Sequence, residues 1–119
     1  TWWEFRHLPN ILFVNFANLK RDMPGEMRRI AQFLDVPIDK ARWEETVEYC
    51  SFDWMKRNAS KSVPLGGAFW DAGAQVFINR GTNGRWAEIL TPEDVAEYEA
   101  RAVEELGPEC VRWLATGRV

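Results

Sequence analysis

The feature that most constrains the fold is one apolar run near the start of the chain. Residues 11–16 read Ile-Leu-Phe-Val-Asn-Phe, and Pro9-Asn10 and Ala17-Asn18 bound the run on either side. A short apolar and β-branched run of this kind is typical of a strand buried on both faces, as in a parallel sheet. One such strand cannot form a sheet alone, and the rest of the chain supplies no obvious parallel neighbour. The sequence therefore predicts an α/β fold with one parallel-type strand at about residues 11–16.

The remaining residues are mostly helical by their pattern. Helical segments are expected at residues 1–7, from Asp22, from Asp39, from Ser51, over 91–106 and over 110–114. The clearest start signal is Thr91-Pro92-Glu93-Asp94, because it places Thr at the N-cap, Pro at the first helical position and an acid at the third. We also expect Ser51 to cap a short helix.

Between residues 58 and 86 the helical periodicity is lost. Five glycines and one proline fall in this stretch. Irregular segments longer than about 15 residues are uncommon in compact domains and are usually functional or disordered. The aromatic residues of this stretch argue against disorder. We therefore expect a long ligand-binding loop over residues 58–86.

Composition excludes several classes of protein. The 119 residues carry 15 Lys and Arg against 18 Asp and Glu, a net charge of −3, so a broad nucleic-acid surface is not expected. No apolar run reaches the about 20 residues of a membrane span, and the start lacks the pattern of a secretory signal, so we expect a cytoplasmic protein. Two cysteines, Cys50 and Cys110, are too few for a disulfide framework. With His7 as the only histidine, neither a metal site nor a Ser/His/Asp triad is expected.

Positive charge is concentrated in the middle of the chain. Residues 53–86 carry five basic and two acidic side chains, whereas residues 87–119 carry three basic and eight acidic ones. Such a local excess favours a small anionic ligand, although a solvated surface would have the same composition.

Residues 77–86 carry the most informative pattern. Gly81 and Gly84 allow a tight turn whose amides can form an anion-binding nest, and Arg80 adds a planar guanidinium suited to phosphate or sulfate. The alternative is an ordinary Gly-Asn loop packed by Trp86, and spacing alone does not decide between the two.

Four segments, in order, resemble the cytosolic-type sulfotransferases. Trp2-Trp3-Glu4, the apolar run and residues 18–22 are similar to the family's W-W-E, its strand and the segment after it. Residues 25–34 resemble its G-E-I-x-K-I-x-x-F-L helix, residues 50–58 its T-S-F-x-x-M-K-x-N element, and residues 77–86 its F-x-R-K-G-x-x-G-D-W element. This family transfers a sulfuryl group from 3′-phosphoadenosine 5′-phosphosulfate (PAPS) to a hydroxyl or amine of a small acceptor and releases adenosine 3′,5′-bisphosphate (PAP).

The resemblance implies the C-terminal portion of one P-loop-type, three-layer sulfotransferase domain over residues 1–119. The family's phosphosulfate loop, its lysine and its catalytic histidine lie in the N-terminal half and have no counterpart here. The chain also opens at Thr1 without an initiating Met. We therefore expect that an N-terminal half is its missing partner, that no catalytic residue lies here, and that these residues alone transfer no sulfuryl group. Residues 60–76 would form part of the acceptor pocket or a lid.

The resemblance assigns the cofactor-binding residues. They are Phe16, Ser51, Phe52, Met55, Asn79, Arg80 and Gly81. The Ser-Phe-x-x-Met element lies against the adenine, and the element at 79–81 grips the 3′-phosphate. Phe16 replaces a tyrosine and lacks its hydroxyl, while Asn79 replaces an arginine and removes one bidentate clamp. By spacing alone, Phe16, Phe52 and Met55 would be core residues.

Two further expectations concern assembly and activity. The family's dimer motif matches only at Thr91, and Ala87 stands where that motif begins with Lys, so the sequence does not support the family's dimer interface. The alternative to an enzyme is a non-catalytic nucleotide-binding or interaction module that retains the half-fold.

Overall fold

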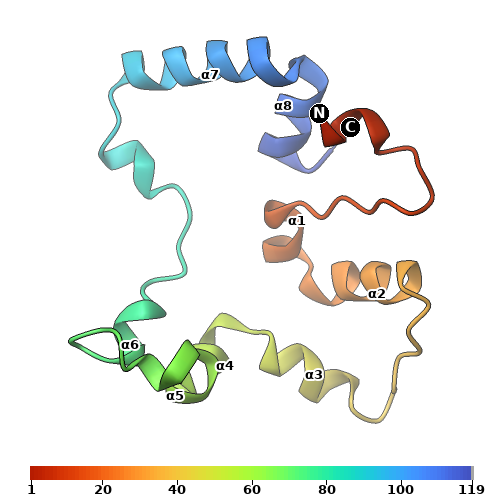
Figure 1. Cartoon of the computed structure of the whole chain (residues 1–119), viewed down its shortest axis with the longest axis vertical. Helices are drawn as coiled ribbons and strands as arrows, with labels where there is room; N and C mark the ends of the chain where they lie inside the picture. Colours follow the sequence, from red (N-terminus) through yellow and green to blue (C-terminus); the bar gives the residue numbers. More distant parts are fainter. Residues whose placement is uncertain (119) are drawn as a thin grey trace. The chain divides into compact units, whose positions relative to one another are not determined.

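The computed structural model describes residues 1–118, and regular secondary structure in these residues is helical throughout (Figure 1). The chain forms two compact units. The first comprises Thr1–Ile38 and the chain from Trp86 onward, and the second is Asp39–Arg85.

The first unit is held by an aromatic cluster. Its elements are η1 (Trp2–Phe5), α1 (Phe16–Arg21), α2 (Met23–Phe33), α7 (Pro92–Leu106) and α8 (Pro108–Thr116), with η3 (Arg85–Glu88) at the boundary. The ring centroids of Trp3, Phe13 and Trp113 lie 5.2–5.7 Å apart. Trp3 is buried, so this cluster fixes η1 and the segment after it against α8.

Side-chain amides join α1 to the end of α8. Asn15 is only 4% exposed. Its Oδ1 accepts from the Ala17 amide at 2.8 Å and caps α1, while its Nδ2 donates to the Trp113 carbonyl at 2.8 Å. Asn18 Nδ2 donates to the Gly117 carbonyl at 3.1 Å. Carbonyls at a helix C-terminus lack partners within the helix, and these two amides supply them.

The strand predicted over residues 11–16 is absent. Residues 11–15 have no regular structure, and Phe16 is the first residue of α1. The Asn15 backbone is extended, with φ −93° and ψ 131°. A strand exists only through hydrogen bonds to a neighbouring strand, and no residue of the described part of the chain forms such a ladder.

The helix starts predicted at Asp22 and Thr91 are confirmed, and the one predicted at Asp39 is not. Asp22 caps α2 by accepting from the Gly25 amide at 2.9 Å. Thr91 and Asp94 form the expected capping box of α7. The start expected at Asp39 is wrong, because its carboxylate closes a turn on the Ala41 amide and the next helix begins only at residue 43.

The second unit consists of short helical turns around a small core. Its elements are α3 (Trp43–Tyr49), α4 (Phe52–Arg57), α5 (Ala59–Ser62), η2 (Pro64–Gly67) and α6 (Ala74–Phe77). Ala59, Val63 and Ala74 are buried, and Trp70 and Ile78 pack against them. Part of the irregular loop expected over residues 58–86 therefore consists of short helical turns, while residues 78–84 have no helix or strand. Turns of four residues are too short to show a periodic apolar stripe.

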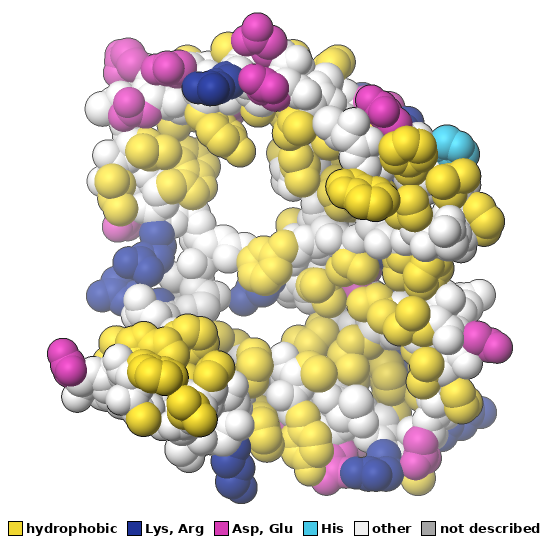
Figure 2. All heavy atoms as spheres, in the orientation of Figure 1, with side chains coloured by type: hydrophobic (Ala, Val, Ile, Leu, Met, Phe, Trp, Pro, Cys, Tyr) yellow, Lys and Arg dark blue, Asp and Glu magenta, His cyan; other side chains and the backbone are white. Residues whose placement is uncertain are grey.

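Both units leave large apolar side chains exposed. Trp2 and Ile89 of the first unit are each 76% exposed, and Phe69 of the second is 75% exposed. Figure 2 shows hydrophobic side chains gathered over the segment that contains α4, α5 and α6. No helix within residues 1–118 is both long and apolar enough to cross a membrane.

Candidate nucleotide-binding site

The second unit brings the two predicted ligand-binding segments into contact. Gly81 has φ +63°, which favours glycine, and a Cβ added there would lie 2.6 Å from two ring carbons of Phe52. Carbon atoms in contact normally lie about 3.5–4.0 Å apart, so only a glycine lets the turn approach the ring this closely. Phe52 and Gly81 are thus neighbours in space although 28 other residues separate them in the sequence.

Lys56 holds the same two segments together. Its Nζ donates to the Asn79 carbonyl at 2.6 Å and lies 5.7 Å from the centroid of the Phe52 ring. The Lys56 carbonyl in turn accepts from Gln75 Nε2 at 3.0 Å. Lys56 is not among the site residues predicted from the sequence. The sequence did contain a signal for this residue, because Lys56 stands at the position of the lysine in the family's T-S-F-x-x-M-K-x-N element.

The start of α4 positions the residues expected against the adenine. Ser51 Oγ accepts from the Trp54 amide at 3.1 Å, which confirms Ser51 as the N-cap. A hydroxyl that accepts one hydrogen bond still has its own proton to donate. Phe52 and Met55 are three residues apart on α4, so they share one face of the helix, and both are partly buried.

Tyr49 orients α4 from outside the site. Its ring centroid lies 4.8 Å from that of Trp54. A hydrogen bond from its hydroxyl to Glu45 raises the pKa of Tyr49 above its ordinary value, so the phenol stays neutral. Tyr49 therefore contacts α4 through the Trp54 ring while its own side chain stays exposed.

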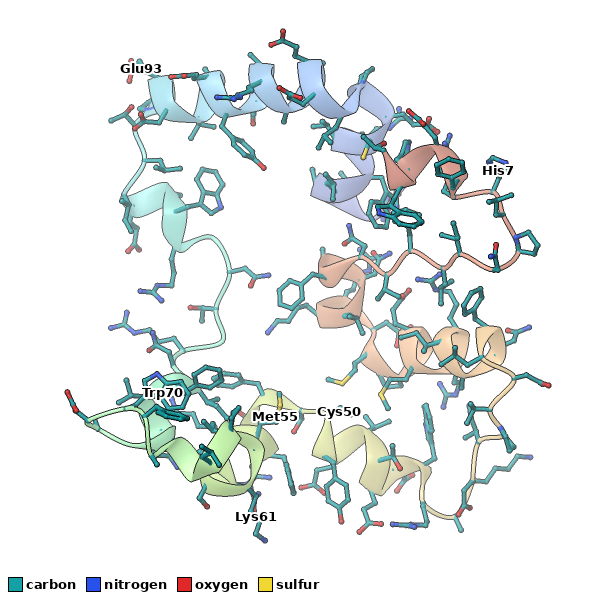
Figure 3. The ribbon with its side chains drawn as sticks, viewed as in Figure 1. His7, Cys50, Met55, Lys61, Trp70 and Glu93 are labelled. Carbon is teal, nitrogen blue, oxygen red and sulfur yellow. The ribbon has the colours of Figure 1, made fainter. Side chains whose placement is uncertain are left out.

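Arg80 and Lys56 are the cations of this unit that lie in or against the 79–81 turn. Arg80 is exposed and forms no ion pair with any residue in the described range, so its guanidinium is available to a ligand. Arg57 is paired with Glu48 at 3.2 Å. Lys61 points away from Met55 and Trp70 (Figure 3).

Six of the seven predicted residues lie in this unit. Ser51, Phe52 and Met55 belong to or cap α4, and the segment of Asn79, Arg80 and Gly81 lies against it. Phe16 belongs to the first unit and is 62% exposed. The role of all seven residues in binding a nucleotide stays a prediction. Within residues 1–118, no group of His, Cys, Asp and Glu side chains has the arrangement of a metal site.

Comparison with known proteins decides the family. The sequence profile of the sulfotransferase domain matches residues 1–107. The chain belongs to the sulfotransferase family. A glycolipid sulfotransferase of Mycobacterium bovis is 29% identical to this sulfotransferase chain over 119 residues. Cytosolic sulfotransferase 12 of Arabidopsis thaliana is 33% identical over 109 residues and covers 87% of the chain.

The fold is also that of the family. The crystal structure of mouse sulfotransferase SULT7A1 complexed with PAP matches 98% of this sulfotransferase chain with a TM-score of 0.73, at 20% identity. The chain spans 36% of the length of the M. bovis relative, 32% of the Arabidopsis relative and 44% of the mouse structure.

Proposed function

We propose that this chain supplies the adenine and 3′-phosphate contacts of a PAPS-dependent sulfotransferase acting on a hydroxyl or amine of a small acceptor. PAPS brings the sulfuryl group, and the residues of this chain bind and orient its nucleotide part. Phe52 and Met55 offer an aromatic ring and a thioether to a purine. Arg80 and the Gly81 amide face the 3′-phosphate.

The observation that carries this proposal is the contact between α4 and residues 79–81. An adenine and a 3′-phosphate are parts of one small molecule, so the groups that bind them must lie close together. The close approach of Phe52 to Gly81 and the Lys56–Asn79 hydrogen bond are consistent with this requirement, because they join α4 to the 79–81 turn. Lys56 also adds a second positive charge beside Arg80, which offsets the loss of the guanidinium that Asn79 replaces.

Three finer assignments belong to the same proposal. Phe16 is assigned to the adenine by the family resemblance, and the 11–16 segment would form a strand only beside other parallel strands. Residues 60–76 contribute to the acceptor pocket, and the exposure of Leu65 and Phe69, at 72% and 75%, suits an apolar acceptor. The 119 residues alone transfer no sulfuryl group, because no phosphosulfate loop or catalytic histidine is recognisable among them.

The test measures the affinity for PAP by calorimetry. The sample is the protein with the full length of its sulfotransferase relatives, not the 119 residues alone. Arg80→Ala removes charge-assisted hydrogen bonds to a phosphate and should weaken binding by about tenfold or more. Arg85→Ala is the matched control, because Arg85 is an exposed arginine of the same segment that the proposal leaves outside the site.

Unchanged affinity in Arg80→Ala, or equal losses in both variants, would refute the 3′-phosphate assignment. PAP binding without any sulfuryl transfer by the full-length protein would favour the non-catalytic nucleotide-binding module instead.

A further inference from the structure

A second cluster of positive charge lies in the first unit, in a pocket lined by residues at and just after the C-terminal ends of α1 and α8. This α1–α8 pocket is lined by Arg21, Arg112, Thr116 and Arg118 and has a volume of about 400 Å³. Small-molecule sites typically measure about 300–1,000 Å³. None of the four residues belongs to the segments assigned to the nucleotide, so the pocket requires its own explanation.

The pocket contains most of the basic side chains of an otherwise acidic segment of the chain. Residues 87–119 carry only three basic side chains against eight acidic ones, and two of the three, Arg112 and Arg118, line the pocket. The acidic side chains gather instead along α7 (Figure 2). None of the lining residues is acidic. Within the first unit, the basic side chains that line the pocket and the acidic side chains of α7 therefore lie in different places.

No protein carboxylate in the described range neutralises these arginines. Arg21, Arg112 and Arg118 form no ion pair within residues 1–118, and all three are exposed. Arg21 Nη2 donates to the neutral Asn18 Oδ1 at 2.6 Å. A helix C-terminus contributes about half a negative charge, so the two helix ends offset about one of the three positive charges. A net attraction for anions remains.

Hydrogen bonds within the chain hold the backbone around these arginines in the absence of a ligand. The Asn18–Gly117 and Asn15–Trp113 hydrogen bonds hold the end of α8 against α1. Thr116 Oγ1 donates to the Arg112 carbonyl at 2.8 Å and accepts from the Arg118 amide at 3.1 Å. Binding therefore has to order only the arginine side chains, which limits its entropic cost.

We propose that the α1–α8 pocket binds the oxyanion of a phosphate or sulfate group, through residues other than those proposed for the nucleotide. Guanidinium groups present two parallel N–H donors to such an oxyanion, and three of them line this pocket. A nucleic-acid polymer is the poorer occupant, because the neighbouring α7 is acidic and the whole chain carries a charge of −3.

The test measures binding of inorganic pyrophosphate to the full-length protein by calorimetry. Arg112→Gln and Arg118→Gln should each weaken binding by about tenfold or more, because each removes charge-assisted hydrogen bonds. Arg101→Gln is the matched control, since it removes the same charge from the exposed surface of α7 outside the pocket. Arg118 follows α8, so its variant leaves the helix intact if Arg112→Gln unfolds the unit.

A second arm separates the two sources of such an oxyanion. Vesicles of equal parts phosphatidylcholine and phosphatidic acid are compared with vesicles of phosphatidylcholine alone. Pyrophosphate binding that depends on Arg118 indicates a free oxyanion, and vesicle binding that depends on Arg118 indicates a lipid headgroup; either supports the proposal.

Three results would overturn it. The first is no binding in either arm. The second is an equal loss in Arg101→Gln and Arg118→Gln, which indicates a diffuse charge effect. The third is a loss of pyrophosphate binding in Arg80→Ala but not in Arg118→Gln, which assigns the anion to the proposed nucleotide site. The PAP affinity of Arg80→Ala is measured separately, so this outcome is distinguishable from failure of the proposed function.

Discussion

At the scale of single residues, Gly81 and Gly84 have the same backbone requirement but different surroundings. Their φ angles are +63° and +81°. A Cβ added at Gly81 meets the Phe52 ring at 2.6 Å, whereas one added at Gly84 meets nothing within 4 Å. A non-glycine residue in the left-handed region costs about 1–2 kcal/mol, so we expect Gly84→Ala to lower the free energy of unfolding by about that amount. Gly81→Ala should cost more.

Urea unfolding and PAP calorimetry of the two variants measure this difference. Only Gly81→Ala should also weaken PAP binding, because only it displaces the 79–81 turn from α4. Equal losses of stability in the two variants would mean that the Phe52 ring moves aside without cost. The contact between α4 and residues 79–81 would then not fix the position of the 79–81 turn.

The residues also show where sequence reasoning stops. The pairing of α4 with residues 79–81 was expected only because the family places both segments on one nucleotide. Spacing alone gave Phe52 and Met55 as core residues. The role of Lys56 depends on where the Asn79 carbonyl lies, which no local pattern contains. The α1–α8 pocket was not predicted at all, because Arg21 lies 91 or more residues before Arg112 and Arg118 in the sequence.

At the scale of elements, the start of α7 depends on the capping box of Thr91 and Asp94. Thr91→Ala removes the hydroxyl that accepts from the Asp94 amide, at a cost of about 1 kcal/mol. We expect a lower melting temperature by circular dichroism. Thr46→Ala is the control, since Thr46 lies inside α3 and alanine is the better helix former there. A Thr91→Ala protein as stable as Thr46→Ala would show that packing alone fixes the start of α7.

The same box gives α7 a defined dependence on pH. Hydrogen bonds from the Thr91 amide and hydroxyl lower the pKa of Asp94 below its ordinary value. A group whose folded pKa is lowered stabilises the fold above its unfolded pKa, and this stabilisation is lost as the pH falls through the folded pKa. Loss of α7 helicity in acid should therefore be smaller in Thr91→Ala, whose cap is already weakened.

Elements also divide into those that local sequence determines and those that it does not. The caps at Ser51 and Thr91 were predicted because a cap is a contact between residues two or three positions apart. The strand at residues 11–16 was predicted from its apolar run, yet a strand requires a partner that the described residues do not provide. The short turns α5, η2 and α6 were missed because four residues carry no measurable period.

At the scale of the whole molecule, the apolar run and the exposed apolar surface lead to one expectation. The chain spans 36% of the M. bovis relative and 44% of the mouse sulfotransferase structure. Within the described range, 19 large apolar side chains such as those of Trp2 and Phe69 are exposed, whereas only five apolar residues are buried. Apolar side chains that pack against a larger sheet would be exposed in this way in a chain that lacks the rest of that sheet.

Hydrogen exchange tests that expectation at the predicted strand. In the 119-residue chain, the amides of residues 12–16 should exchange rapidly, because they have no ladder partner. In the protein produced at its relatives' full length, they should exchange slowly, as expected for a central strand bonded on both sides. The amides of α7 are the internal control, since α7 is helical in the 119-residue chain and should be protected in both proteins. Rapid exchange of residues 12–16 in the full-length protein, with α7 protected, would show that the apolar run is not a strand of the sulfotransferase sheet.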